Sequence, residues 1–173
     1  MTSVPADGPL QERFVALLDE HRRLLFRIAA SYCRNPEDRR DLIQETAVQL
    51  WRAFPKYDER VRFSTWMYRI ALNVAISFHR RQTVRARHAS FDDVAILEVP
   101  AESSPASPED VELRLLERFL ERLDPFDRAL MLLYLDGNRH DTIAEVLGIS
   151  ETNVGTKIGR LKERLRRELA ENG

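Results

Sequence analysis

The sequence predicts an all-α fold: two small helical domains joined by a flexible acidic linker. Apolar residues recur at spacings of three and four in both ends of the 173-residue chain, which is typical of amphipathic helices, and no strand-like alternation lies between turn signals. Between the helical parts lies a segment with three prolines, several serines and only acids among its charged residues, too polar to bury a core. We therefore predict domains over residues 10–88 and 109–170, and the linker over 89–108.

Three helices are expected in the first domain. The first ends before Asn35-Pro36, because a residue that precedes proline avoids the helical conformation. The second ends at Pro55, and the third begins near Ser64, a suitable N-cap, and runs to Arg87. The residues expected to face the core are Phe14, Leu17, Leu18, His21, Leu24, Leu25 and Ile28 in the first helix, Leu42, Ile43, Val48, Leu50, Trp51 and Phe54 in the second, and Trp66, Met67, Ile70, Ala71, Val74 and Ala75 in the third.

Four helices are expected in the second domain. The first starts near Pro108, where the opening turn of a helix tolerates proline, and Asp124-Pro125 breaks it. The next covers residues 126–135 and ends at Asp136-Gly137-Asn138. Two more helices follow, separated by Gly148.

Charge is distributed unevenly along the chain, although the net charge is only −1. Residues 10–88 carry 16 basic and 9 acidic residues, residues 89–112 carry seven acids and no base, and residues 157–167 carry six bases and one acid. Because each phosphate contact releases counterions locally, two basic regions can bind DNA despite the neutral total. An ordinary solvated helix surface is the alternative for each region.

Several classes of protein are disfavoured. No apolar run approaches the roughly 20 residues that span a bilayer, and no secretory signal is visible, so we expect a cytoplasmic protein without membrane insertion. The single cysteine, Cys33, is expected in the core. The four histidines have no ligand spacing with cysteine or aspartate, and no phosphate-binding glycine loop occurs, so we expect no metal, no cofactor and no enzymatic activity.

The spacing of small, glycine and apolar residues near the C-terminus is typical of a helix-turn-helix. Ala144 is small where two helices pack closely, Gly148 follows at the turn, and Val154 can anchor the second helix, which Ser150 can cap. The second helix of such a motif enters the major groove. Its outward positions are Thr152, Asn153, Thr156, Lys157 and Arg160. A helical hairpin that binds no DNA is the alternative.

Motifs in both domains resemble those of sigma-70-type transcription factors, most closely the extracytoplasmic-function (ECF) group. Residues 38–45 (Asp-Arg-Arg-Asp-Leu-Ile-Gln-Glu), Leu50-Trp51 and residues 63–73 (Phe-Ser-Thr-Trp-Met-Tyr-Arg-Ile-Ala-Leu-Asn) look like region 2. Residues 123–129 (Leu-Asp-Pro-Phe-Asp-Arg-Ala) lie where region 4 begins. The resemblance implies a factor that binds core RNA polymerase, through the β′ clamp and the β flap, and directs initiation at promoter DNA.

The resemblance also implies roles for residues of the first domain. The set that grips the β′ clamp is Asp41, Leu42, Gln44 and Glu45. Asp41 and Glu45 are four residues apart and therefore share one helix face. The alternative to a polymerase contact is that this face is simply an acidic surface in solvent. The set that reads the opened −10 element is Arg62, Phe63, Trp66, Tyr68, Arg69, Asn73, Arg80 and Arg81. The alternative role is packing in the core for Tyr68 and an internal hydrogen bond for Asn73. Trp51 and Trp66 are expected mainly in the core.

For the second domain, the resemblance implies that Thr156, Lys157 and Arg160 contact the −35 element. Gly155 and Gly159 depart from the family, where bulkier or basic residues are common, and leave the −35 preference open. An anti-sigma protein is a further expected partner. From charge alone, the acidic residues 89–112 are a candidate to occupy the basic channel of the polymerase, with a solvated spacer as the alternative.

Two rival functions differ from this interpretation. A conventional helix-turn-helix regulator explains residues 139–167 but leaves the motifs of the first domain without a role. An enzyme that acts on nucleic acid needs paired carboxylates, a metal cluster or an activated nucleophile, and the sequence offers none of these.

Overall fold

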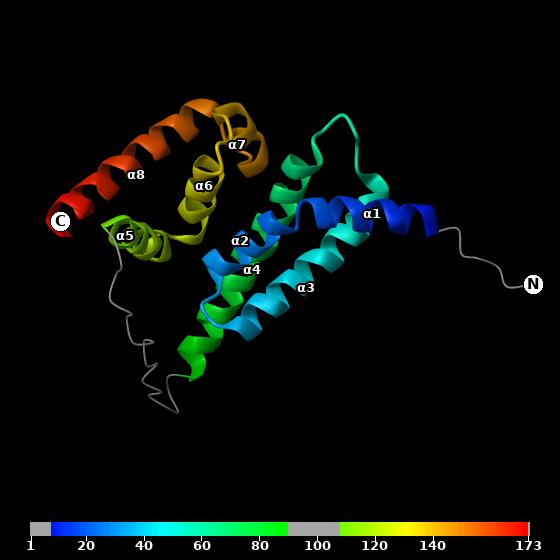
Figure 1. The fold of residues 1–173 in the computed structure, drawn as a ribbon, viewed down its shortest axis with the longest axis horizontal. Helices are drawn as coiled ribbons and strands as arrows, with labels where there is room; N and C mark the ends of the chain where they lie inside the picture. The colour runs from blue at the N-terminus through cyan, green and yellow to red at the C-terminus, as the bar shows by residue number, and fades with distance from the viewer. Residues whose placement is uncertain (1–7, 90–107, 173) are drawn as a thin grey trace, which may run out of the picture. The chain divides into compact units, whose positions relative to one another are not determined.

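The computed structural model describes residues 8–89 and 108–172, and every regular element in these ranges is helical, which confirms the predicted fold class (Figure 1). The helices are α1 (Gly8–Glu20), α2 (Arg22–Tyr32), α3 (Pro36–Ala53), the 3-10 helix η1 (Phe54–Lys56), α4 (Phe63–Ala89), α5 (Pro108–Arg122), α6 (Pro125–Leu135), α7 (His140–Leu147) and α8 (Glu151–Asn172). None of them is both long enough and apolar enough to cross a bilayer.

The chain divides into two compact units after Phe78, within α4, and we describe each unit separately. Unit 1 holds α1, α2, α3, η1 and most of α4, and unit 2 holds α5 to α8. Most of the predicted linker, residues 90–107, lies outside the described residues. The domain boundaries drawn from the sequence stay predictions.

Two helix boundaries in unit 1 differ from the sequence prediction. The expected first helix is two helices, α1 and α2, separated at His21. Nδ1 of His21 lies 2.9 Å from the Leu17 carbonyl oxygen, and the His21 ring packs on the Phe63 ring with centroids 5.2 Å apart. These contacts hold the backbone of His21 outside the helical region, at φ −104° and ψ 9°. Helix α4 begins at Phe63, and the Arg62 carbonyl accepts a bond from the Trp66 N–H, so Ser64 lies inside the first turn and is not the N-cap.

An aromatic cluster joins α1, the end of α3, η1 and the start of α4. Phe54, which is only 3% exposed, lies at its centre, with ring centroids 5.1 Å from Phe14 and 6.2 Å from Trp66. Paired aromatic rings add stabilisation beyond the apolar area that they bury. The other members of this aromatic cluster are Trp51, Tyr57 and Phe63.

Polar contacts fix the loop that leads from η1 into α4. The Tyr57 hydroxyl donates to the Val61 carbonyl at 2.6 Å, and burial, followed by the charge of Glu59, raises the pKa of this hydroxyl above its ordinary value. Arg13 of α1 forms a 2.6 Å ion pair with Glu59 and lies over the Phe54 ring. The loop is therefore held by a hydrogen bond within it and by an ion pair to α1.

Caps form at three of the helix breaks that the sequence predicted. The Asn35 side chain accepts a bond from the Asp38 N–H at 2.8 Å at the start of α3. The Asp124 side chain accepts bonds from the N–H groups of Phe126 and Asp127 at the start of α6. Gly148 ends α7 at φ +69°, a conformation that glycine adopts without strain.

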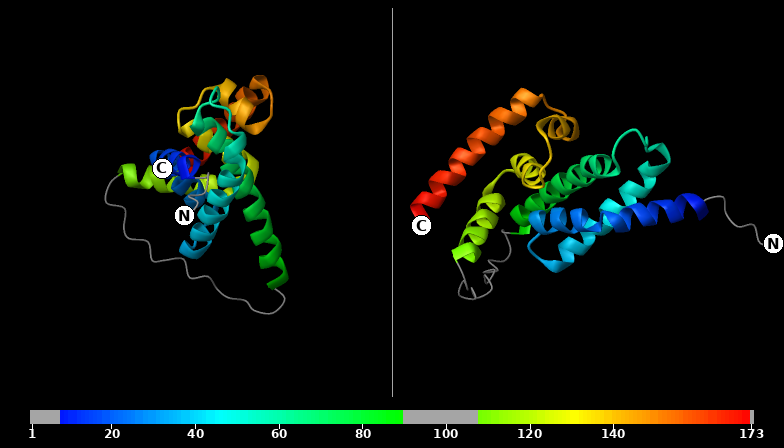
Figure 2. Two further views of the ribbon diagram at one scale, coloured as in Figure 1. Left: turned by 90° about the vertical axis from the view of Figure 1, so that its right-hand side faces the viewer. Right: turned by 45° about the horizontal axis from the view of Figure 1, so that its top comes forward.

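A buried arginine organises unit 2. Arg128 on α6 is 4% exposed, and its guanidinium donates to the carbonyls of Leu120 at 2.9 Å, Glu121 at 2.6 Å and Leu123 at 3.2 Å. These carbonyls lie in the last turn of α5 and directly after it, where most of them have no partner within the helix, although the Leu120 carbonyl also accepts the Leu123 N–H at 3.2 Å. Arg128 thus ties α6 to the C-terminal end of α5. Figure 2 shows that α7 follows α6 and leads into the long α8.

Candidate nucleic-acid and polymerase interface

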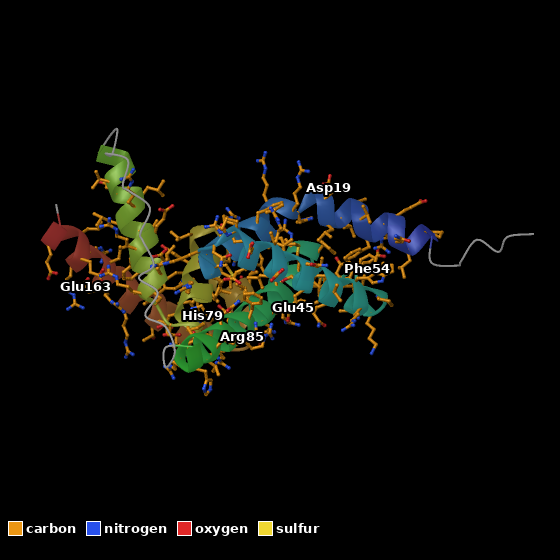
Figure 3. The ribbon with its side chains drawn as sticks, turned by 90° about the horizontal axis from the view of Figure 1, so that it is seen from below. Asp19, Glu45, Phe54, His79, Arg85 and Glu163 are labelled. Atoms are coloured by element: carbon orange, nitrogen blue, oxygen red, sulfur yellow. The ribbon has the colours of Figure 1, made fainter. Side chains whose placement is uncertain are left out.

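One face of α3 presents acidic and polar side chains. Asp41 and Gln44 are exposed and Glu45, which Figure 3 labels, is partly exposed. Leu42 differs from these neighbours because it is 1% exposed and packs in the core, so its side chain is not accessible to a partner. Of the four residues that the sequence assigned to this contact, the structure brings three to one accessible surface, with Leu42 as support.

Val48 was predicted in the core, and this prediction is wrong. Its side chain is 42% exposed, because it lies seven residues after Asp41 and therefore on the same helix face. The spacing of Asp41, Gln44, Glu45 and Val48 (i, i+3, i+4, i+7) was the signal that could have placed it correctly. We call these four residues the α3 face.

Five residues of the predicted −10 set lie along one side of α4 or at its start. Their spacings of four, three, four and seven keep them on one helix face, and Arg62, Arg69, Asn73 and Arg80 are exposed, whereas Trp66 is partly exposed. Ser77, which the sequence interpretation missed, is exposed on the same face, and helical periodicity would have found it. We call the set Arg62, Trp66, Arg69, Asn73, Ser77 and Arg80 the α4 stripe.

Two aromatic residues of the predicted −10 set are part of the interior. Phe63 is 6% exposed and Tyr68 is 5% exposed, so the packing alternative holds for Tyr68 and neither ring is accessible to a base. Trp66 remains partly exposed and contacts Tyr57, with ring centroids 4.9 Å apart. Arg81 is exposed, but its register puts it at the edge of the α4 stripe.

The helix-turn-helix has the geometry that the sequence predicted. Ser150 caps α8 by accepting a bond from the Asn153 N–H at 3.2 Å, and Val154 is fully buried, as an anchor to α7 requires. Thr152, Asn153, Thr156 and Arg160 are exposed on the opposite side of α8. These four residues form the accessible surface of the second helix.

Lys157 is the exception in the predicted −35 set. Its ammonium group forms a 3.0 Å ion pair with Asp127 and lies 5.5 Å from the centre of the Phe126 ring, and its side chain is 34% exposed. Two further bases of the basic cluster at residues 157–167 also make contacts within unit 2: Lys162 lies over the Tyr134 ring, and Arg164 lies over the Phe119 ring. Half of the basic cluster therefore attaches α8 to α5 and α6.

The two glycines of α8 differ in their surroundings. A Cβ atom at Gly155 would lie 3.7 Å from Nδ1 of His140, an ordinary contact between α8 and α7. A Cβ atom at Gly159 would meet nothing within 4 Å, and Gly159 is exposed beside Arg160. Packing within unit 2 therefore gives no reason for a glycine at position 159.

Comparison with known proteins gives the same organisation. The family described as Sigma-70 region 2 matches residues 17–85, and the family described as Sigma-70, region 4 matches residues 113–165. RNA polymerase sigma factor CarQ of Myxococcus xanthus is 30% identical over 162 residues, which cover 93% of this chain and 91% of CarQ. ECF RNA polymerase sigma factor SigW of Bacillus subtilis (strain 168) is 25% identical and covers 92% of this chain and 90% of SigW.

Solved structures share the fold. The structure of CnrH in complex with the cytosolic domain of CnrY matches with a TM-score of 0.68 at 26% identity, over 94% of this chain and 91% of CnrH. The sigma factor RpoE, in complex with the anti-sigma factor NepR from Bartonella quintana, matches with a TM-score of 0.67 at 20% identity, which is a likeness of fold alone. The chain therefore belongs to the ECF group of the sigma-70 family and is a non-enzymatic initiation factor for promoter recognition by RNA polymerase.

Proposed function

We propose that the α3 face docks on the β′ clamp of core RNA polymerase. The observation that carries this proposal is the exposure of Asp41, Gln44 and Val48 on one face above the buried Leu42. Carboxylates and an amide pair with basic and polar groups of a partner, while Val48 adds an apolar contact that excludes water. A rigid helix face that combines acidic, amide and apolar groups is better explained by contact with a protein partner than by exposure to solvent alone.

We further propose that the α4 stripe captures the opened −10 strand. Its arginines can neutralise phosphates, and Asn73 offers both a donor and an acceptor to a base edge. Because Phe63 and Tyr68 are buried, Trp66 and its neighbour Tyr57 are the aromatic side chains that can stack on an unpaired base at the α4 stripe. The aromatic cluster holds these groups at the start of α4.

In the third part of the proposal, α8 holds the −35 duplex in the major groove through Thr152, Asn153, Thr156 and Arg160, while unit 2 contacts the β flap. Lys157 fixes the orientation of α8 through Asp127, and its contribution to DNA affinity is secondary. Promoter recognition in this scheme is divided between a strand-capturing unit and a groove-reading unit, and the factor acts in the cytoplasm, where the polymerase works.

A pull-down with core RNA polymerase tests the docking proposal. Replacement of both Asp41 and Glu45 by alanine should reduce the recovered complex about tenfold or more, because charged pairs at an interface are costly to break. A matched control replaces Glu12 and Glu20, which are exposed acids on α1, and should leave recovery unchanged. Equal recovery of the α3 variant and the control would overturn the proposal.

We also propose that an anti-sigma protein holds this chain inactive. The support comes from two relatives of like fold, CnrH and RpoE, whose structures contain CnrY and the anti-sigma factor NepR. Affinity purification of the full chain from its own cells should recover such a partner, and addition of that partner should displace core polymerase. A partner that binds without displacing polymerase would contradict the proposal.

The acidic residues 89–112 have a separate proposed role, based on charge alone: they occupy the basic channel of the polymerase before the transcript grows. Replacement of their seven acids by lysine should weaken initiation. Unchanged initiation would leave the solvated spacer as the explanation.

A further inference from the structure

The outer face of α2 combines an exposed aromatic ring with arginines. Leu24, Leu25 and Ile28 face the core, whereas Arg23, Phe26 and Arg27 are exposed on the opposite side of the helix. Phe26 is 56% exposed, a larger exposed fraction than that of any other aromatic residue described. Arg23 and Arg27 are four residues apart and therefore form one row along α2, and Phe26 lies beside this row.

The charge of this face suits a polyanion. Arg22, at the start of α2, extends the basic surface toward α1, where its guanidinium pairs with Asp19 at 3.2 Å (Figure 3 labels Asp19). Both side chains of this pair are about two-thirds exposed, and exposed pairs contribute little to stability, so a phosphate can replace Asp19 as the partner of Arg22 at small cost.

The start of α2 lies beside the start of α4. His21, which directly precedes α2, packs on Phe63, the first residue of α4, with ring centroids 5.2 Å apart. Phe26 lies five residues after His21, which is roughly 7.5 Å along the helix axis. The start of α2 therefore lies next to the end of α4 that carries Arg62 and Trp66, and Phe26 follows on the outer face of α2.

We propose that this outer face of α2 binds single-stranded promoter DNA that leaves the α4 stripe, an inference that rests on the proposed −10 function. Phe26 stacks on an unpaired base, and the row formed by Arg23 and Arg27 neutralises the phosphates beside it. A single strand fits better than a duplex, because the face of a ring can stack only on a base that has left its pair. The contact prolongs the open complex and requires no particular base sequence.

Photo-cross-linking in the complete promoter complex tests this contact. A benzophenone-bearing phenylalanine at position 26 keeps an aromatic side chain, so the fold is preserved, and it should cross-link to one DNA strand in the open complex of holoenzyme and promoter. The matched control places the same residue at Val15, which is 54% exposed on α1 and has Gln11, Glu12 and Asp19 as its helical neighbours. The control position should give no DNA cross-link.

Open-complex lifetime gives a second readout that separates stacking from apolar docking. Phe26→Tyr keeps the ring and should leave the lifetime within about twofold, whereas Phe26→Leu and the double change of Arg23 and Arg27 to glutamine should each shorten it about tenfold. A cross-link only to polymerase, no cross-link, or an unchanged lifetime in Phe26→Leu would overturn the proposal. Failure of the wild-type chain to form holoenzyme or an open complex would instead refute the proposed function.

Discussion

The two units use their positive charges differently. In unit 1, Arg62 and Arg69 of the α4 stripe face outward, and aromatic residues such as Phe54 hold the structure together. In unit 2, Arg128 is buried and Lys157, Lys162 and Arg164 contact other side chains of the same unit, which leaves Arg160 as the exposed base in the predicted −35 set. The number of basic residues in a segment therefore does not measure the surface that it offers to DNA.

The difference follows from what each unit has available to fill its interior. Unit 1 contains both tryptophans and its aromatic cluster packs around Phe54, so most of its basic groups stay in solvent, and Arg13 over the Phe54 ring is an exception. Unit 2 fixes its helices with cations that cap a helix end or lie over aromatic rings. Substitutions should therefore affect stability through aromatic residues in unit 1 and through cations in unit 2.

The largest effect is expected for Phe54→Ala in unit 1. Removal of a buried ring from the centre of the aromatic cluster should lower the free energy of unfolding by about 4 kcal/mol, because apolar burial is lost and a cavity remains. Tryptophan fluorescence during urea unfolding reports on this unit, since both tryptophans lie in it. A loss below about 1 kcal/mol would show that the cluster does not support the unit.

The corresponding change in unit 2 is Arg128→Ala. It removes the guanidinium hydrogen bonds to three carbonyl groups at the end of α5 and should lower the stability of unit 2 by about 3 kcal/mol. Circular dichroism should show an earlier unfolding transition while the tryptophan transition stays in place. Arg166→Ala, at an exposed pair with Glu163, is the control and should change stability by less than about 0.5 kcal/mol. Similar behaviour of both variants would contradict the capping role of Arg128.

A comparison of Arg160→Ala with Lys157→Ala separates DNA contact from internal support. Arg160→Ala should weaken −35 binding by holoenzyme about tenfold without a change in stability. Lys157→Ala should lower the stability of unit 2 by about 1 kcal/mol, since it loses an ion pair and a contact with the Phe126 ring. Fluorescence anisotropy with labelled duplex and urea unfolding measure the two effects. The assignment fails if Lys157→Ala weakens DNA binding more than Arg160→Ala at unchanged stability.

The smallest effect is expected at Gly159, and it has the opposite sign. The Cβ atom of an alanine there meets no neighbouring atom, and the substitution removes the conformational cost of a helical glycine. The free energy of unfolding should therefore rise by up to about 1 kcal/mol. Gly148→Ala is the informative contrast, because its positive φ should make the same substitution destabilising. If both substitutions changed the free energy of unfolding in the same direction in urea, the geometry of the turn and of α8 would be contradicted.

The sequence predicted the fold class and most of the helix boundaries because their determinants are local. Asn35-Pro36, Asp124-Pro125 and Gly148 act through their own backbone preferences and through side chains that bond within a few residues. The break at His21 was not predictable in this way, because it involves contact with Phe63, far along the chain. An uninterrupted apolar stripe does not reveal such a break.

The candidate sites were only partly predictable for the same reason. Family motifs placed Asp41 and Asn73 on accessible surfaces, but the motifs also include Leu42, Phe63 and Tyr68, which are buried. The burial of Arg128 and the pairing of Lys157 with Asp127 depend on tertiary contacts that span up to 30 residues. Helical periodicity alone could have identified Val48 and Ser77 as surface residues.

Transcription by reconstituted holoenzyme on genomic fragments, followed by mapping of the start sites, tests the central claim most directly. Core polymerase with the wild-type chain should initiate at sites preceded by shared −35 and −10 elements, and core alone should not. A variant with Arg69 and Asn73 replaced by alanine should join core normally but fail to open these promoters, because the α4 stripe is disrupted. Normal initiation by that variant, or starts without shared elements, would contradict the account.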